Sequence, residues 1–442
     1  MNKFQDEYLK GAPVSRLKGL TALSPVAVFL GCYLAVSVAV GDFYRMPVAV
    51  AMLVASVWAV IIYRGRSLSD CIETFSRAAG HANILYMIWI FILAGAFSAV
   101  ARHIGAVEAT VRLALGVFPP QFILPTLFFA ACFISLAIGT SVGTVVALTP
   151  LAVEIGGIEG GDVAFYVAVI LGGAFFGDNL SFISDTTIAA TRSQGCSMSD
   201  KFKANSWIVV PAAIVTLILY AILGNATPAV PTESDVSPWL ILPYLAVIAT
   251  AIMGWNVTVV LCLGLLCALV IGALSGHPLL DMAHAAGDGI NSLGELIVVT
   301  LLASGMLGII KAAGGINYLL QVLTRRIHGR RGAQAVISLL VAMVNLCTAN
   351  NTVAIITVGS ISRSIAGRFG VDARKSASLL DTASCIVQSL IPYGAQTLLA
   401  TSLAGISAAA LFPYLYYPWV LTVSLILSII FLYPRRLNNS PD

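Results

Sequence analysis

The chain has 442 residues, of which 59% are hydrophobic and only 10% are charged. A soluble protein carries about 25% charged residues, so a soluble globular domain is excluded, whereas a bilayer suits many apolar helices of about 20 residues each. With a net charge of +4, eight scattered cysteines and five histidines, we expect no nucleic-acid partner, no zinc site and no other cofactor.

Apolar segments follow one another along the chain and predict a polytopic, all-α membrane protein. They lie at 24–41, 46–63, 82–101, 121–157, 163–191, 206–224, 237–253, 255–275, 293–310, 333–362, 376–410 and 413–433. Two of them, 121–157 and 376–410, are too long for one straight span and are interrupted by small and polar residues. The first segment lacks a convincing cleavage site and is expected to remain as a span.

The two halves of the chain match each other at a shift of 210 residues, which predicts an internal repeat. The matches are Gly95 with Gly305, Gly105 with Gly315, Gly139–Ser141 with Ala349–Asn351, and Thr187, Ala190, Thr191 and Gly195 with Thr397, Ala400, Thr401 and Gly405. We therefore expect a cytoplasmic N-terminal segment (1–22), a first transmembrane repeat (23–224), an external linker (225–236), a second repeat (237–434) and a cytoplasmic tail (435–442).

Loop charges indicate that the two repeats have opposite orientations. The loop 64–80 has three arginines and its counterpart 277–290 has no basic residue, whereas 102–120 has two arginines and 311–331 has five basic residues. Because basic loops stay in the cytoplasm, corresponding loops are predicted to lie on opposite sides of the membrane, with both termini cytoplasmic.

An odd number of crossings in each half would invert the second copy. We therefore expect each half to have about five transmembrane helices, which is an odd number, plus one helical hairpin. The hairpins are predicted at 121–157 and 333–367. Whether the hairpins cross fully or re-enter is open at this stage. Inverted repeats with broken helices at the midplane are the pattern of secondary transporters.

The densest polar stretch inside an apolar segment is 177–187, which reads GDNLSFISDTT. A charge at the bilayer centre costs about 3 kcal/mol, and non-helical backbone survives there only inside protein or beside a water-filled cavity. We therefore predict an unwound segment whose oxygens bind Na⁺ or a proton. The predicted ligands are Asp178, Asn179, Ser181, Ser184, Asp185, Thr186 and Thr187. The alternative, a polar loop at the membrane surface, is disfavoured by the apolar flanks.

The counterpart segment in the second half, 388–397, is neutral and reads QSLIPYGAQT. Its Pro392 and Gly394 predict a helix break. Further breaks at Gly139–Thr144 and Thr348–Thr352 predict hairpin tips with inward polar groups, although close packing through small residues is an alternative for them. The predicted substrate or second-half site comprises Thr140, Ser141, Asn350, Asn351, Thr352, Gln388 and Gln396.

The remaining charged residues near apolar segments are less informative. Asp381 lies near Arg374 and Lys375, so a salt-bridged helix end and a functional role are both open. Arg102 and Lys311 follow spans and are expected to snorkel. No lysine or arginine lies clearly at mid-membrane, so only helix N-termini could attract a substrate carboxylate.

The stretch Gly173–Thr187, reading GAFFGDNLSFISDTT, resembles the G-D-x-x-S-P-x-S-D-T motif of the NhaC family of Na⁺/H⁺ antiporters. The likeness extends over most of the chain, and the tip at 139–143 is similar to a less specific family element. Phe182 stands where the motif has proline, whereas Pro392 keeps a proline in the second half. The family includes exchangers of malate and lactate and carriers of amino acids, so the resemblance implies Na⁺ coupling rather than one substrate.

These features predict a secondary active transporter of the cytoplasmic membrane that exchanges Na⁺ for H⁺ by alternating access. Asp178 and Asp185 would each hold Na⁺ or a proton, because the two cations compete for the same oxygens. The alternative is Na⁺-coupled symport or exchange of a small organic solute, an amino acid or a carboxylate. The expected partners are the lipid bilayer, Na⁺ and H⁺; a homodimer is left open. An enzyme is not expected, since Phe175 replaces the first glycine of the G-x-G-D signature of intramembrane aspartyl proteases.

Overall fold

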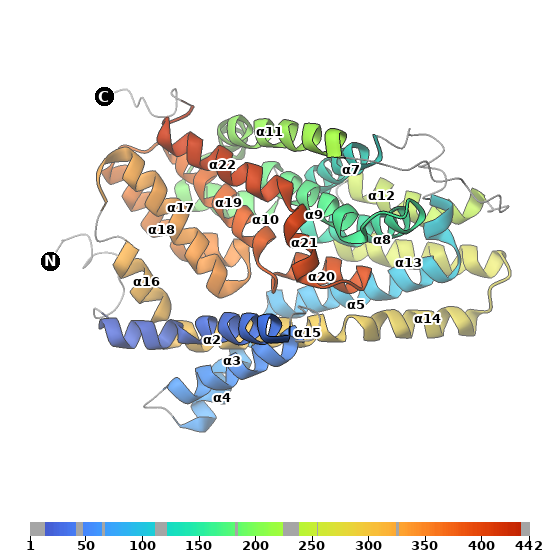
Figure 1. Cartoon of the computed structure of the whole chain (residues 1–442), viewed down its shortest axis with the longest axis horizontal. Coiled ribbons are helices and arrows are strands. Elements are labelled where there is room, and N and C mark those ends of the chain that lie inside the picture. The colour runs from blue at the N-terminus through green and yellow to red at the C-terminus, as the bar shows by residue number, and fades with distance from the viewer. Residues whose placement is uncertain are drawn as a thin grey trace.

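The computed structural model describes residues 14–40, 47–63, 67–110, 122–181, 184–223, 238–253, 255–323 and 327–434. Within these ranges the protein is all helical, which confirms the predicted fold class (Figure 1). The external linker 225–236 and the tail 435–442, as well as most of the segment 1–22, lie outside the described residues, so the predicted division of the chain stays a prediction.

The first half contains α2 (Arg16–Val40), α3 (Val48–Ile62), α4 (Leu68–Ala79), α5 (Ala82–His103), α7 (Ile123–Ile138), α8 (Ser141–Ile158), α9 (Val163–Leu180), α10 (Asp185–Gln194) and α11 (Met198–Leu223). The second half contains η2 (Pro238–Ile241), α12 (Leu242–Ile252), α13 (Val257–Leu274), α14 (Leu279–Ser292), α15 (Gly294–Ala312), α16 (Gly315–Leu323), α17 (Gly329–Thr348), α18 (Asn351–Arg368), α19 (Ala373–Leu390), α20 (Ala395–Ala404), α21 (Ala408–Leu411), η3 (Phe412–Tyr414) and α22 (Tyr416–Ile430).

Seven helical segments of the described chain are long and apolar enough to cross a membrane, or eight if one bent pair counts as a span. This is fewer than the apolar segments of the sequence because several segments form helices too short for a full crossing. Those shorter helices are Val48–Ile62, Ile123–Leu136, Trp239–Thr250 and Tyr416–Ile430. A multi-pass membrane protein is therefore confirmed, while the number of crossings in each half stays a prediction.

The hairpins and broken helices recur along the chain with equal spacing. The helices α8 and α18 begin at Ser141 and Asn351, and the helices α9 and α19 end at Leu180 and Leu390, so both pairs are 210 residues apart. Both predicted hairpins are present, as α7–α8 and α17–α18. The offset equals the shift found in the sequence, whereas the opposite membrane orientation of the two halves stays a prediction.

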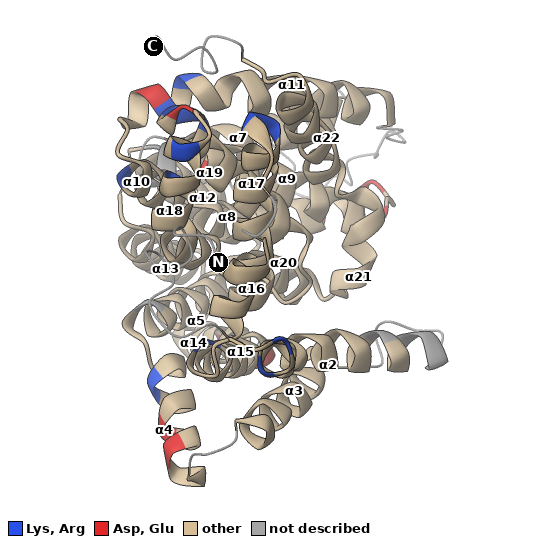
Figure 2. Ribbon diagram, turned by 90° about the vertical axis from the view of Figure 1, so that its left-hand side faces the viewer, with Lys and Arg blue, Asp and Glu red and all other residues tan. Residues whose placement is uncertain are grey.

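Seen along the main helix direction, the bundle has two parts (Figure 2). Helices α2, α3, α4, α14 and α15 lie together in the lower part of this view, and the hairpins, the broken helices, α11 and α22 lie in the upper part. The polar segments that the sequence singles out therefore belong to the upper part, and the lower part packs beside it.

Two matched glycines let short helices of one half pack on the other half. A Cβ atom at Gly95 of α5 would lie 2.3 Å from the carbonyl oxygen of Gly289 in α14, so these two backbones touch. A Cβ atom at Gly305 of α15 would lie 2.3 Å from the Phe75 ring of α4. Because no other residue leaves this space, the matched glycines have a packing role in both halves.

Candidate functional site

The first helix break lies between α9 and α10, where the sequence predicts an unwound segment. The helix α9 ends at Leu180, and α10 begins at Asp185. Ser184 caps α10, since its Oγ accepts the Thr187 backbone N–H at 3.2 Å and donates to the Asp178 carbonyl oxygen at 2.7 Å. One hydroxyl thus satisfies unpaired backbone groups of both helix ends, which stabilises the break.

The second helix break lies between α19 and α20 and contains the predicted Pro392. Phe182, at the corresponding position of the first break, lies outside the described residues. Across the second break, Gln388 Nε2 donates to Gln396 Oε1 at 2.9 Å. Neutral amides therefore connect the two ends of this broken helix.

Each hairpin tip turns on one residue in the left-handed region of backbone space. These residues are Gly139, with φ +73°, between α7 and α8, and Ala349, with φ +49°, between α17 and α18. Glycine adopts this conformation freely, whereas it costs alanine about 1–2 kcal/mol. Asn350 offsets part of this cost by capping α18, because its Oδ1 accepts the Val353 N–H at 3.0 Å.

A cavity of about 660 Å³ lies where the two tips and the two breaks meet. Its lining includes the predicted residues Thr140, Ser141, Asp178, Asp185, Thr186, Asn350, Asn351, Thr352, Gln388 and Gln396. It also includes Tyr86 and Met87 of α5 and Arg192 of α10, which the sequence does not point to. The fold thus brings both halves of the predicted site to one cavity.

The Asp178 carboxylate accepts hydrogen bonds from both hairpin tips and is only 5% exposed. Its Oδ2 accepts from Ser141 Oγ at 2.8 Å and from Asn351 Nδ2 at 3.5 Å. Gln396 Nε2 of the second broken helix donates in turn to Ser141 Oγ at 3.0 Å. Asp185 lies in the first turn of α10, exposed on the cavity wall. Two hairpin tips therefore bind the buried carboxylate directly, and the second broken helix reaches it through Ser141.

Glycines before Asp178 set its position against the first hairpin. Cβ atoms at Gly173 and Gly177 would lie 2.5 Å from the Ala131 Cβ and 2.3 Å from the Ser135 Cβ of α7. Ser135 Oγ also donates to the carbonyl oxygen of Ala174 at 2.5 Å. Because α9 lies directly against α7, the depth of Asp178 is fixed relative to the hairpin.

The stretch 139–143, GTSVG, has the letters of the G-x-S-x-G motif of serine hydrolases. In those enzymes the serine follows a strand, whereas Ser141 here follows one helix and starts another. Its hydroxyl donates to Asp178. The stretch is therefore a hairpin tip and does not have the geometry of a nucleophile elbow.

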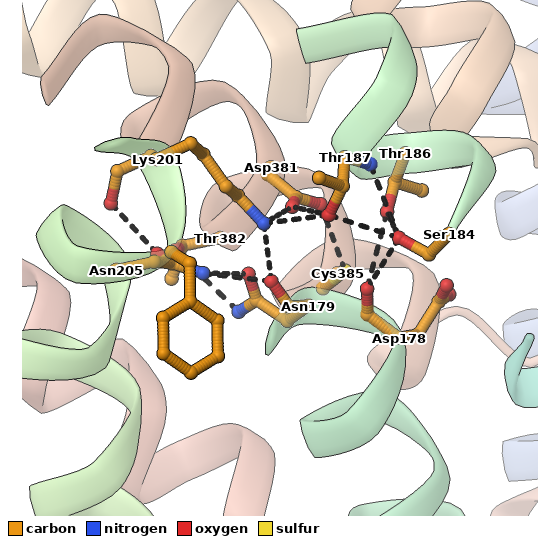
Figure 3. Close-up of polar contacts among 12 residues, drawn as sticks. Asp178, Asn179, Ser184, Thr186, Thr187, Lys201, Asn205, Asp381, Thr382 and Cys385 are labelled. Carbon is orange, nitrogen blue, oxygen red and sulfur yellow. Dashed lines mark hydrogen bonds and ion pairs between the residues drawn. The ribbon is translucent and has the colours of Figure 1, made fainter. Parts of the chain in front are cut away.

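Four predicted ligands are absent from the cavity lining, namely Asn179, Ser181, Ser184 and Thr187. Ser181 Oγ donates to the Leu136 carbonyl oxygen at 2.9 Å. Asn179 and Thr187 face a second polar cluster behind the break, on the side of the segment away from the Asp178 carboxylate (Figure 3). The predicted shell is thus divided into two groups, one on each side of the unwound segment.

The cluster behind the break contains an ion pair that the sequence does not predict. Lys201 of α11 and Asp381 of α19 form it, and both side chains are wholly buried. The burial of Lys201 inside the protein is not predicted from the sequence, whereas the expectation that no lysine or arginine lies clearly at mid-membrane stays a prediction. The available signal is the i, i+4 spacing of Lys201 and Asn205, which places both side chains on one face of α11.

Asp381 does not form the salt-bridged helix end with Arg374 or Lys375 that the sequence left open as one alternative. Arg374 pairs with Asp372 instead, at 2.7 Å, and Lys375 donates to the Tyr433 carbonyl oxygen at 2.8 Å. In the parts of the chain that the structure describes, no group of three or more His, Cys, Asp or Glu side chains could hold a metal ion. The polar groups of the site are therefore carboxylates, amides and hydroxyls, together with the Lys201 ammonium and the Arg192 guanidinium.

A helical bundle with two hairpins and two broken helices around a buried carboxylate has the architecture of a membrane transporter. Comparison of the sequence with protein families agrees. The chain belongs to the Na⁺/H⁺ antiporter family, whose sequence model matches residues 3–225 and 227–434. The predicted resemblance to NhaC is thereby confirmed, and family membership supports secondary transport of Na⁺ and H⁺.

Two characterised relatives are similar over most of their length. The Na⁺/H⁺ antiporter NhaC of Alkalihalophilus pseudofirmus is 24% identical over 364 residues, which cover 75% of this chain and 78% of the relative. The malate-2H⁺/Na⁺-lactate antiporter of Bacillus subtilis is 23% identical over 456 residues, with 94% and 96% covered. Among solved structures, the Alcanivorax borkumensis YdaH transporter has a TM-score of 0.41 and 15% identity, covering 82% of this chain and 88% of that chain.

Proposed function

We propose that this protein exchanges Na⁺ for H⁺ across the cytoplasmic membrane by alternating access, with Asp178 as the main ion-binding carboxylate and Asp185 as its second carboxylate. The supporting observation is the Asp178 carboxylate itself, buried yet on the wall of a cavity, with donors from both hairpin tips. Membership of the Na⁺/H⁺ antiporter family supports Na⁺ and H⁺ as the two exchanged ions.

Exchange follows from competition for one pair of oxygens. Na⁺ binds the ionised carboxylate, and a proton neutralises the same group, so the two cations exclude each other at Asp178. The Ser141 hydroxyl suits both states, because it can donate to the carboxylate or turn a lone pair toward Na⁺. An ionised carboxylate without a bound cation is costly to bury. The protein therefore changes between its inward-open and outward-open states only with Na⁺ or a proton bound at Asp178.

The walls of the cavity and the charged residues near it support a proposal for the side to which it opens. The lining continues along α10 from Asp185 to Arg192, whose side chain is exposed, and along α18 to Ile356. In Figure 2 the viewer faces the end of the bundle at which α10 and α18 carry basic residues. Because basic residues are enriched on the cytoplasmic side of membrane proteins, the cavity is proposed to open to the cytoplasm.

The test is transport by the purified, full-length protein in liposomes with an acidic interior and a pH dye inside. Addition of external Na⁺ should drive proton efflux in the wild type and in the control Asp281→Asn, which removes an exposed carboxylate of α14. Asp178→Asn should abolish this efflux and Asp185→Asn should reduce it strongly. Unchanged exchange in both site variants would rule out this assignment.

A second candidate function is Na⁺-coupled exchange of a small organic solute. The cavity has room for about 20 water molecules at ~30 Å³ each, more than one Na⁺ requires. The Arg192 guanidinium on its wall is a partner for a substrate carboxylate. A relative named as a malate-2H⁺/Na⁺-lactate antiporter aligns with 94% of the chain.

Uptake of radiolabelled carboxylates and amino acids into the same liposomes separates the two functions. Na⁺-dependent uptake that Arg192→Gln weakens, with Arg363→Gln as a control for loss of a nearby arginine, would support the organic cargo. Proton efflux driven by Na⁺ alone, without any uptake, would leave Na⁺/H⁺ exchange as the function.

A further inference from the structure

The Lys201 ammonium lies in a closed group of oxygen atoms behind the first helix break, which we call the oxygen cage. Its Nζ contacts Asp381 Oδ2, the Asn179 carbonyl oxygen and Thr187 Oγ1, the last at 2.8 Å (Figure 3). Lys201 and Asp381 are both 0% exposed. Thr187 Oγ1 also lies 3.3 Å from Asp381 Oδ2, so the oxygens contact one another as well as the ammonium.

The cage has the composition of a binding site for a hard cation. A carboxylate, a backbone carbonyl and a hydroxyl are the ligands that such cations take. The carbonyl belongs to Asn179, in the last turn of α9, and the C-terminal end of a helix attracts positive charge. Unwound backbone and helix C-termini of this kind coordinate ions in broken-helix transporters. In this chain a covalently attached cation occupies the position.

Neutral hydrogen bonds hold the cage together independently of Lys201. Asn205, one turn further along α11, donates to the Asn179 carbonyl oxygen at 2.8 Å. Its Oδ1 accepts from Ser378 Oγ at 2.7 Å and from Thr382 Oγ1 at 2.8 Å, both on α19. Since these bonds join α11, the break and α19, the cage oxygens remain in place when the ammonium is removed.

The second half of the chain has no equivalent of this arrangement. At the shift of 210 residues, Lys201 corresponds to Leu411 and Asp381 corresponds to Leu171. Lys201 is in the first half and Asp381 is in the second, so each charge lacks a counterpart in the other half. They are wholly buried, where a charge is costly unless it is paired, so a specific role is expected for them.

We propose that the oxygen cage is a second cation site of this protein, permanently filled by the Lys201 ammonium in place of Na⁺. The tethered cation neutralises Asp381 and holds the first break, so that only the cation at Asp178 is exchanged. The statement that one cation is exchanged rests on the proposed function. The statement that the oxygen cage can bind a free cation does not rest on it, and it is tested without measuring transport.

The test is Lys201→Met, which keeps a long side chain and removes the charge, combined with Asp178→Asn to eliminate the cavity site. The purified full-length protein is unfolded thermally in 0 to 300 mM NaCl, with choline chloride holding the ionic strength constant. We expect the unfolding temperature of Lys201→Met/Asp178→Asn to rise with Na⁺ and Li⁺, while Asp178→Asn alone shows no such rise. Adding Asp381→Asn should remove the response to Na⁺.

Several results would overturn the proposal. One is a folded Lys201→Met/Asp178→Asn protein whose unfolding temperature does not depend on Na⁺ or Li⁺. Another is failure to recover Lys201→Met in any of these cations, because the cage then accepts no free cation. If instead Na⁺ stabilises Lys201→Met/Asp178→Asn while Asp178→Asn alone transports normally, the proposed function fails and the cage remains.

Discussion

The two helix breaks share a backbone plan and differ in charge. The helices α9 and α19 end 210 residues apart, and α10 and α20 both have 10 residues. Asp178 and Asp185 of the first break correspond to Gln388 and Ala395 of the second. At these positions the first half of the chain therefore supplies the carboxylates, and the second half supplies amides that lie on the same cavity. If the proposed cation site is correct, it needs a carboxylate from only one of the two halves.

The two breaks also differ in how they are anchored. Thr187 Oγ1 accepts a hydrogen bond from Lys201 at 2.8 Å. The corresponding Thr397 Oγ1 is buried and, within the described chain, has no hydrogen-bond partner. The first break is therefore held by a charged group in addition to neutral hydrogen bonds, whereas the second is held by neutral hydrogen bonds and packing. We expect the second break to rearrange more easily during transport.

Loss of the buried ion pair is the largest effect that we expect from this asymmetry. Asp381→Asn leaves the Lys201 charge buried without its carboxylate, so the free energy of unfolding should fall by about 3–5 kcal/mol. Arg374→Gln breaks the half-exposed pair with Asp372 and should cost less than about 1 kcal/mol. Unfolding of both variants in detergent by denaturant measures the difference, and equal losses would show that charge does not anchor the first break.

Exchange of ions should depend much more on Asp178 than on its neutral counterpart Gln388. Two unit charges about 4 Å apart interact by about 4 kcal/mol at an effective dielectric of 20, so Asp178→Asn should weaken Na⁺ binding about 1000-fold. Gln388→Ala removes a hydrogen bond across the second break, worth about 1 kcal/mol, and should weaken it about fivefold. Binding of radioactive Na⁺ to the purified variants measures the difference, and similar losses would contradict the division of roles.

Much of this architecture can be predicted from the sequence because it rests on local signals. Long apolar segments interrupted by glycine or asparagine predict the hairpins, which the structure has as α7–α8 and α17–α18. Polar residues inside an apolar segment likewise predict the broken helix at Asp178. These signals lie within short stretches of chain and therefore require no knowledge of the tertiary contacts.

The direction of the side chains beside the break could not be predicted, because the sequence does not fix where α9 ends and α10 begins. Asn179 and Thr187 therefore looked equivalent to Asp178, although they face the opposite side. Lys201 and Asp381 come from separate helices near charged loops, and only the packing of α11 and α19 on the break brings them together.

The two hairpin tips differ in backbone strain, because one turns on an alanine and the other on a glycine. Ala349 has a φ of +49° and Gly139 has a φ of +73° at the corresponding turn. Ala349→Gly should therefore raise the free energy of unfolding by about 1 kcal/mol, and Gly139→Ala should lower it by a similar amount. Thermal unfolding of both variants measures these shifts, and changes of the same sign would show that the tips are not equivalent turns.

The smallest expected difference concerns the residues that follow these turns. Asn350 caps α18 through its Oδ1 at 3.0 Å, whereas Thr140 makes no side-chain cap at the start of α8. Asn350→Ala should therefore cost about 1 kcal/mol of stability, and Thr140→Ala should cost less than about 0.5 kcal/mol. Both residues line the cavity, so Na⁺-driven proton efflux is measured beside thermal unfolding. If Thr140→Ala slows exchange without changing stability, the Thr140 hydroxyl contributes to ion binding; if neither quantity changes, the first tip acts on the ion only through Ser141.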